Sequence, residues 1–299
     1  MTVEQPGPGE PRRPHGPRDP GDAWVVAPDG TRYWGRFGAA GLLTLDPDRG
    51  VLLQHRVSWS HFGGTWALPG GARHEGEDAG VAALREAHEE AGVPEAAVRP
   101  RFAGVLDLGH WSYTTLVGDV IEPFEAVIND PESVELSWVP IALVDTYPLH
   151  PGFAEAWPRL RALLGVRPAV VVDAANAVGS VPDGWWKDRR GATERLIGRI
   201  GSLASRGVVA AALDLPEHTW FPVWHVVVEG QARAVPDAGG VRIVRAPASG
   251  DDAIAAEAAR LAGDGHTVTV VTSDRGLAAR AEAAGASVRG SRWLLDLLA

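Results

Sequence analysis

Residues 71–93 read GARHEGEDAGVAALREAHEEAGV, and this stretch decides how the first half of the chain folds. Nothing between Asp78 and Ala91 breaks a helix, whereas Gly92 and Pro94 end one. At about 100° per residue, one side of this helix is apolar and carries Gly80, Val81, Leu84, Ala87 and Ala91. We therefore expect a helix that packs on the rest of the fold through this side.

The other side of the predicted helix carries a cluster of carboxylates. Glu86, Glu89 and Glu90 are spaced i, i+3, i+4, so their side chains are neighbours. Only Arg85 lies close enough to offset their repulsion, and no lysine alternates with them as on an ordinary solvated face. Hard oxygen ligands grouped in this way favour Mg²⁺ or Mn²⁺, which complete their coordination with water and substrate phosphates.

The spacing within this stretch carries a family resemblance. Gly71, five residues, Glu77, seven residues and then the run REAHEEAGV from Arg85 to Val93 resemble the signature box of the Nudix hydrolases. The one mild departure is Ala87, at a position that often holds a bulkier aliphatic residue. The resemblance covers roughly residues 23–165. It implies an α/β/α sandwich with a mixed sheet, and cleavage of a nucleoside diphosphate linked to a further group.

The resemblance also implies roles for single residues. Glu86, Glu89 and Glu90 would bind the metal, and Arg85 would orient a carboxylate. Glu77 would support the loop and reach a second metal. In the turn Leu68-Pro69-Gly70-Gly71, the two glycines, Gly70 and Gly71, would let the backbone approach the phosphates.

The expected reaction is attack of water on a phosphorus atom of the pyrophosphate, with metal ions polarising the oxygens and activating the water. Some family members place the general base outside the box, in a late loop. Here Glu135 is the assigned candidate, with Glu132 as the second, because both precede the predicted strand Leu136–Val139. The alternative is that both are ordinary solvated acids of a loop.

Composition and charge set the outer bounds. A length of 299 residues favours two domains, which we place at 23–165 and 166–299, joined near Val166-Arg167-Pro168. Residues 1–22 are rich in Pro and Gly and are predicted to be a disordered tail. The absence of cysteine fits a reducing cytoplasm, and no apolar run approaches the roughly 20 residues that span a bilayer. The oligomeric state stays open.

The two halves differ in their charge. Residues 1–165 carry the whole net charge of −10, whereas residues 166–299 carry equal numbers of acids and bases. An acidic half suits an enzyme that acts on a small phosphorylated molecule and argues against a nucleic-acid groove there.

The apolar runs predict a different sheet in each half. In the first half they predict strands of a mixed fold at Leu42–Leu45, Val51–His55, Arg101–Leu108, Tyr113–Ile121 and Leu136–Val139. In the second half they alternate with helical patterns and predict a parallel α/β sheet from Ala169–Val172, Val208–Leu213, His225–Val228, Val241–Val244 and Thr267–Thr272.

Acids follow several strands of this second sheet. Asp173, Asp214 and Asp274 come directly after strands, and ligands of open α/β sheets gather at the carboxyl ends of strands. Asp251 and Asp252 begin a helix. Any one of these acids is as readily explained as a helix cap.

Together the runs VVVDAAN, LD, GDDAI and VVTSDRGL resemble the NYN/PIN-type nucleases over about residues 168–299. This resemblance implies a divalent metal on Asp173, Asp251 and Asp274, with Asp214 and Asn176 in support. Between Asp251 and its neighbour Asp252, the spacing to Ile254 favours Asp251.

A last cluster mixes aromatic and cationic residues, from Trp185 to Arg190, with Arg195 and Arg199 following. Single-stranded nucleic acid is gripped by such combinations, so RNA is a candidate partner; a buried Trp pair beside a solvated basic helix is the alternative. His55, His61 and His110 show no metal-ligand spacing and are interpreted as structural.

The sequence therefore predicts a Mg²⁺- or Mn²⁺-dependent pyrophosphohydrolase that acts on a nucleotide, fused to an RNase-like domain. Two alternatives stay open. In one, the first domain senses a nucleotide without hydrolysing it, although sensor members of the family usually lose the glutamates retained here. In the other, the first domain processes RNA 5′ ends, which the acidic balance of that half does not favour.

Overall fold

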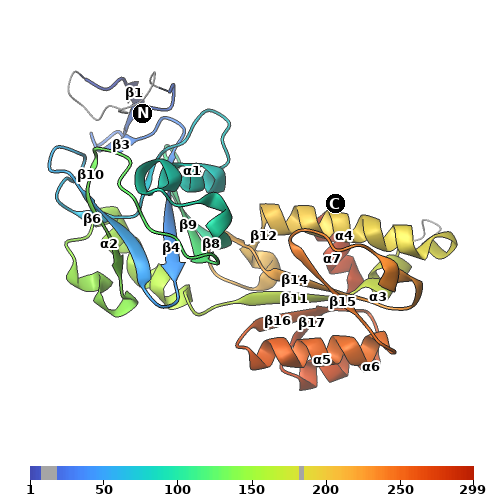
Figure 1. Ribbon diagram of the computed structural model, residues 1–299. Coiled ribbons are helices and arrows are strands. Elements are labelled where there is room, and N and C mark those ends of the chain that lie inside the picture. Colours follow the sequence, from blue (N-terminus) through green and yellow to red (C-terminus); the bar gives the residue numbers. More distant parts are fainter. Residues whose placement is uncertain (8–18, 182–184) are drawn as a thin grey trace. The chain divides into compact units, whose positions relative to one another are not determined.

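The computed structural model describes residues 1–7, 19–181 and 185–299, which form two compact units, Met1–Leu164 and Gly165–Ala299 (Figure 1). The first unit contains a mixed sheet and the second contains a parallel sheet with helices. Among the described residues, no helix is both long enough and apolar enough to cross a membrane.

The sheet of the first unit is mixed, as predicted. Its strands follow the order β10 (Ser133–Val139), β5 (Gly50–Arg56), β4 (Ala39–Asp46), β9 (Ser112–Val120) and β8 (Val98–Asp107). β4 and β9 run parallel and the other neighbours run antiparallel. Two short strands extend it: β6 (Trp66–Ala67) pairs with β5, and β7 (Gly70–Ala72) pairs with β4.

β4 lies at the centre of this unit. All eight of its residues are buried, which requires cover on both faces of the sheet. The helix α1 (Ala79–Ala91) packs against β4 and β9. A second helix, α2 (Pro151–Leu163), buries Phe153, Trp157 and Leu160.

The predicted signature helix is α1, with the expected ends. Asp78 caps its N-terminus by accepting hydrogen bonds from the backbone N–H groups of Gly80 and Val81. Gly92 ends it in the left-handed conformation, at φ 65°.

The buried side of α1 differs from the predicted one. Its buried residues are Ala82, Ala83, Glu86, Ala87, Glu90 and Ala91, whereas Val81 is 57% exposed. The helix is therefore rotated so that small alanines approach β4 and two glutamates point inward. Hydrophobicity alone missed this rotation because the inward glutamates have partners in the preceding loop and strand.

The first unit also contains a three-stranded antiparallel sheet, formed by β1 (Thr2–Glu4), β2 (Trp24–Val26) and β3 (Arg32–Trp34). Thr2–Glu4 are thus ordered as a strand, although we expected them in a disordered tail. Asp22 in the same predicted tail is buried. Residues 8–18 of the predicted tail lie outside the described residues.

The second unit is an all-parallel sheet with the strand order β15 (Val241–Arg245), β14 (Val223–Val228), β11 (Pro168–Asp173), β16 (Thr267–Val271) and β17 (Ser287–Arg289). Alternate residues of β11 face two separate cores. One core is covered by α3 (Ala174–Gly179), α4 (Arg189–Arg206) and α7 (Ser291–Leu298), and the other by α5 (Gly250–Gly263) and α6 (Arg275–Ala283) (Figure 1).

One predicted strand of this sheet is wrong. In Val208–Leu213 only Val208–Val209 is a strand, β12, which pairs with β13 (Thr219–Trp220) and not with the parallel sheet. Ala210–Leu213 instead form a single 3₁₀ turn, η4. Alanine has a low preference for strands, so the apolar run by itself did not favour one. The fifth parallel strand is β17, which the sequence reading missed because it is only three residues long.

Candidate active site

The structure gathers the predicted box residues around Arg85. Its guanidinium holds Glu77 in a bidentate pair, with Nε 2.7 Å from Oε1 and Nη2 2.9 Å from Oε2. Its Nη1 donates to Glu86 at 2.6 Å and reaches Glu89 at 3.3 Å. One half-buried cation thus offsets three carboxylates of the box, which is why they can lie so close together.

Glu77 fastens the loop that precedes α1. Its Oε2 accepts a hydrogen bond from the N–H of His74 at 2.8 Å, and its backbone carbonyl accepts from the Arg73 guanidinium. Hydrogen bonds from Arg85 lower the pKa of Glu77 to about 2. Glu77 therefore stays ionised and is occupied by these partners, which gives it the loop-supporting part of its predicted role.

Glu90 lies in the least solvated position of the box. It is only 7% exposed, and its Oε2 accepts a hydrogen bond from the N–H of Gly70 at 2.8 Å. Burial raises its pKa, and the nearby charge of Glu86 adds to the rise. Burial, with a contribution from the charge of Glu90, also raises the pKa of Tyr113. A bound cation would relieve this uncompensated charge.

The two glycines have a packing reason of their own. A Cβ on Gly70 would lie 2.5 Å from the carbonyl oxygen of Ala40 and from the Cα of Gly41, so glycine lets β7 approach β4. A Cβ on Gly71 would lie 2.6 Å from the carboxylate of Glu86. Glycine at these positions thus allows the carboxylate to lie against the backbone. The approach of substrate phosphates to Gly70 and Gly71 stays a prediction.

The two candidate bases lie in different surroundings. Glu135 lies on β10, opposite His55 of β5, and is exposed. The side chain of Glu132 is only 16% exposed and lies 3.7 Å from the Arg56 guanidinium. Burial raises the pKa of Glu132, and the charge of Glu86 contributes. Glu132 is therefore shielded from solvent and lies within the electrostatic influence of Glu86, whereas Glu135 is exposed. The β-bulge between Ser133 and Glu135 separates the two.

The donor set of the box fits a hard divalent cation. Glu86, Glu89 and Glu90 offer carboxylate oxygens from one helix, and two of the three, Glu86 and Glu90, are buried. In the part of the chain that the structure describes, no three His, Asp or Glu side chains are already arranged to hold a metal ion. Glu86 and Glu89 are held by Arg85 instead, so binding would require these side chains to turn toward the ion.

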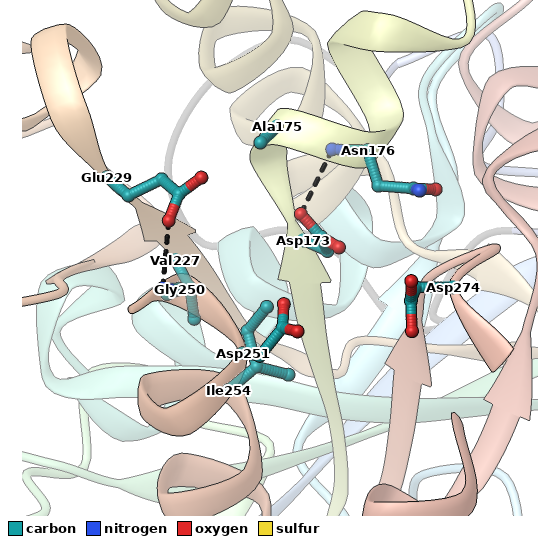
Figure 2. A pocket seen from close by; sticks show the side chains of 9 residues that line it. All are labelled: Asp173, Ala175, Asn176, Val227, Glu229, Gly250, Asp251, Ile254 and Asp274. Atoms are coloured by element: carbon teal, nitrogen blue, oxygen red, sulfur yellow. Dashed lines mark hydrogen bonds between the residues drawn. The ribbon is translucent and has the colours of Figure 1, made fainter. Parts of the chain in front are cut away.

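The acids of the second unit meet at the carboxyl edge of its sheet. A cavity of about 250 Å³ is lined by Asp173, Asp251 and Asp274, with Asn176 and Glu229 (Figure 2). Each comes from a different element, and Figure 2 shows their polar ends around one space. The lining residues include neither Lys nor Arg.

Two of these carboxylates also have a local structural role as helix caps. Asp173 caps α3 through the N–H of Asn176 at 3.0 Å and accepts from the hydroxyl of Thr272 at 3.0 Å. Asp274 caps α6 through the N–H of Leu277 at 2.8 Å. Burial raises the pKa of Asp173, and the charges of Asp251 and Glu229 add to the rise. Asp173 and Asp274 therefore cap helices and also converge with the other acids on one cavity.

Asn176, one predicted supporting residue, lines the cavity, whereas the other, Asp214, and the alternative ligand Asp252 lie elsewhere. Asp214 follows the 3₁₀ turn, not a sheet strand, in the left-handed conformation at φ 54°, and it pairs with Arg289. Asp252 pairs with Arg280 at 2.7 Å, while its neighbour Asp251 faces the cavity. The choice of Asp251 over Asp252 thus agrees with the side on which each carboxylate lies.

The aromatic and cationic cluster divides in two. Trp185 packs against the core, with the Arg189 guanidinium 5.1 Å from its ring, whereas Trp186 is 59% exposed. Arg190 pairs with Glu194 at 2.8 Å. The alternative of a buried Trp pair therefore applies to Trp185 but not to Trp186.

Three residues near these sites were missed from the sequence. Glu229 follows β14, so the rule that singled out Asp173 applied to it equally. Arg56 and Tyr113 lie on strands of the first unit, and no local spacing connects them with the box. Only the pairing of β5 with β10 and of β4 with β9 brings them there.

Comparison with known proteins agrees with this geometry. Residues 35–161 match the NUDIX domain family. The chain is 49% identical over 154 residues to "Putative 8-oxo-dGTP diphosphatase 3" of Mycobacterium tuberculosis, which covers 48% of this chain and 70% of that protein. It is 40% identical over 156 residues to a "Nucleoside triphosphate pyrophosphatase/Nudix hydrolase fusion protein" of Bifidobacterium longum, covering 48% of this chain and 32% of that one.

A solved relative is the crystal structure of the Nudix hydrolase RenU from M. smegmatis. It is 49% identical to this chain, covers 48% of it and 94% of the RenU chain, and has a TM-score of 0.44.

Proposed function

We propose, from the premise that this chain belongs to the Nudix hydrolase family through residues 35–161, that it cleaves the pyrophosphate of a nucleoside triphosphate such as 8-oxo-dGTP. The observation that carries the proposal is the intact carboxylate cluster of α1, held by Arg85 and by the N–H of Gly70. The 49% identical relative named as an 8-oxo-dGTP diphosphatase supports the substrate class.

We assign the metal site to Glu86, Glu89 and Glu90. Bound Mg²⁺ or Mn²⁺ supplies charge neutralisation at the phosphates and acidifies the attacking water. Glu77 and Arg85 keep the loop and the Glu86 carboxylate in place. We propose that the substrate phosphates approach the backbone of Gly70 and Gly71.

We assign the general base to Glu132 and not to Glu135. A base must be ionised enough to accept a proton yet hold it well enough to help the reaction, and the raised pKa of Glu132 moves it toward this range. Arg56 holds its carboxylate, and the N–H of Val57 holds its carbonyl at 2.9 Å. Water that loses its proton to Glu132 would become the nucleophile at phosphorus.

The test is a nucleotide panel with the full-length protein. Released pyrophosphate or phosphate would be followed with dGTP, 8-oxo-dGTP, ADP-ribose and a dinucleoside polyphosphate, each with Mg²⁺ or Mn²⁺. We expect the highest kcat/KM for a nucleoside triphosphate, and Glu132→Gln should lower kcat far more than Glu135→Gln. Turnover of ADP-ribose alone would contradict the substrate class. Tight nucleotide binding without turnover would favour the nucleotide-sensing alternative.

For the second unit we propose a divalent-metal site at Asp173, Asp251 and Asp274, as in the NYN/PIN-type nucleases that its sequence resembles. The specific observation in its favour is the cavity in which these acids meet Glu229, with neither Lys nor Arg among the described residues that line it. Single-stranded RNA is the proposed partner, with the exposed Trp186 as one contact. Cleavage of a labelled single-stranded RNA that is lost with Asp173→Asn would support it; cleavage unchanged by that substitution would contradict it.

We further propose that 23–165 and 166–299 are separate domains. Each has its own buried core, and only Gly165, Val166 and Arg167 lie between Leu164 and β11. On this proposal, nucleotide hydrolysis would need only the first domain.

A further inference from the structure

We propose that the loop of residues 57–64, between β5 and β6, binds the base of the nucleotide by stacking it on Phe62, with Trp59 as a second aromatic contact. This inference rests on the proposed nucleotide hydrolysis and names the part of the substrate that this loop recognises. The loop lies outside the signature box, which defines the reaction but carries no aromatic residue.

The loop is compact and holds its shape through its own hydrogen bonds. The N–H of Ser60 donates to the carbonyl of Val57, and the N–H of Gly63 donates to the carbonyl of Ser60. The Thr65 hydroxyl donates to the carbonyl of Phe62 at 2.6 Å. A Cβ on Gly63 would lie 2.4 Å from the carbonyl oxygens of two loop residues, so the backbone folds tightly on itself. Such a loop presents its side chains in a preformed arrangement.

Phe62 is held in a conformation that costs free energy. Its φ is 54°, in the left-handed region, although it is neither Gly, Asn nor Asp. Its side chain is nonetheless 47% exposed, and Trp59 is 55% exposed. Two large aromatic residues within four positions thus leave much of their surface in water, and one of them is strained. Backbone strain that burial does not offset indicates a functional constraint.

One side of Phe62 is supported by other rings. Its ring centroid lies 4.3 Å from that of His61 and 4.7 Å from that of His150. His61 in turn meets Trp24 edge to face at 5.2 Å. Burial lowers the pKa of both histidines, so they are neutral at pH 7. These rings meet tilted or edge to face and are uncharged, so the support matches an uncharged base and not a phosphate.

The loop is joined directly to the reaction site. The Nε of Arg56 donates to the carbonyl of His61 at 3.2 Å, and its Nη2 lies 3.7 Å from the Glu132 carboxylate. The N–H of Val57 donates to the carbonyl of Glu132 at 2.9 Å. One arginine side chain thus spans the separation between the loop and the proposed base. A nucleotide with its phosphates at the box and its base on the loop would join the same two places.

The expected binding mode is stacking, which tolerates several bases but favours the large ring of a purine. Stacking of one base on one aromatic residue contributes about 1–3 kcal/mol, which is a change in Kd of about 5- to 150-fold. Removal of the Phe62 side chain should therefore weaken the binding of nucleotides and leave the binding of base-free polyphosphate unchanged.

The test uses the full-length protein with Mg²⁺ and measures binding of the non-hydrolysable analogue α,β-methylene-dGTP by calorimetry. We expect Phe62→Ala to raise its Kd at least 5-fold, Trp59→Ala to raise it less, and Phe62→Trp to keep it within about 2-fold of wild type. Inhibition by inorganic tripolyphosphate, which has no base, should be unchanged in all variants. Leu143→Ala is the matched control, because Leu143 is also apolar and 49% exposed.

Phe62→Gly separates the role in binding from a role in folding. Glycine adopts positive φ without strain, so this variant should melt at the same or a higher temperature than Phe62→Ala and still bind the analogue weakly. Equal Kd values for wild type, Phe62→Ala and Phe62→Gly would overturn the proposal, as would an equal loss of tripolyphosphate binding. Phe62-dependent binding in a protein that hydrolyses no nucleotide would uphold this inference and overturn only the proposed activity.

Discussion

The chain contains two clusters of carboxylates, and they were assembled in different ways. In the first unit, Glu86, Glu89 and Glu90 come from consecutive turns of one helix, and Arg85 of the same helix offsets them. In the second unit, Asp173, Asp251, Asp274 and Glu229 come from four places along 102 residues and meet only because parallel strands end at one edge. The first cluster is a local motif and the second a product of topology.

The difference has a consequence for what each acid does without a ligand. The acids of the first cluster mostly bind the Arg85 guanidinium, whereas Asp173 and Asp274 of the second cluster cap helices. Neutralising substitutions should therefore affect chemistry strongly in the first cluster. In the second, loss of a helix cap and loss of a ligand must be separated.

The largest effect is expected in the first cluster. Glu90→Gln keeps an oxygen that can accept the Gly70 N–H but removes the charge, so the fold should persist while kcat falls at least 100-fold. Steady-state kinetics at saturating Mg²⁺ would measure this. Glu95→Gln, at an exposed acid just after the same helix, is the control. Near-normal kcat in Glu90→Gln would remove Glu90 from the metal site.

Arg85 tests whether the first cluster depends on one cation. Arg85→Lys cannot make the bidentate contact to Glu77 and also reach Glu86, so the free energy of unfolding should fall by about 2 kcal/mol. Urea denaturation would measure it. Arg190→Lys, at an exposed i,i+4 pair, should change it by less than about 0.5 kcal/mol. Equal effects of the two substitutions would mean that the Arg85 network adds little to stability.

The second cluster is tested by metal-dependent melting. In a Glu89→Gln, Glu90→Gln background, which removes the first site, Mn²⁺ should still raise the melting temperature by about 5 °C. Asp274→Asn should abolish this rise while retaining the helix cap, because Asn caps nearly as well as Asp. Asp252→Asn, outside the cavity, should leave the rise intact. If Mn²⁺ does not change the melting temperature of the background protein, these acids bind no metal and serve only as helix caps.

His150 gives a smaller, pH-dependent effect in the first unit. Its Nδ1 accepts the Gly152 N–H at 3.1 Å as the cap of α2, and burial lowers its pKa to about 4. The unfolded state, with a pKa near 6.5, therefore binds the proton first, and stability falls as the pH drops from about 6.5 to about 4. His150→Asn keeps the cap without titrating, so it should lose about 1 kcal/mol less than wild type between pH 7 and pH 5. Parallel stability curves for the two proteins would contradict this.

The smallest expected effect concerns the boundary between the two units. A chain that ends at Gly165 should retain cooperative unfolding, and kcat and the dependence on Mg²⁺ should equal those of the full-length protein. Thermal unfolding and steady-state kinetics of the two proteins would be compared. A truncated chain without a cooperative transition would show that residues 1–165 do not form an independent domain.

Much of the first unit could be predicted because its information is local. The ends of α1 follow from Asp78 and Gly92, and the spacing of the glutamates follows from the helical repeat. The buried side of α1 could not be predicted in the same way. Glu86 and Glu90 point inward because Arg85 and the N–H of Gly70 receive them, and a hydrophobicity pattern cannot count such partners.

The sequence by itself determined the Nudix box, its helix and the alternation of strands and helices in the second unit, because each depends on residues within a few turns of one another. Only the tertiary structure decided which acids share a site. It placed Glu132 against Arg56 and left Glu135 exposed, and it brought Glu229 to the cavity while Asp214 pairs with Arg289 instead. Strand pairing sets these distances, and strand pairing is a property of residues far apart in the chain.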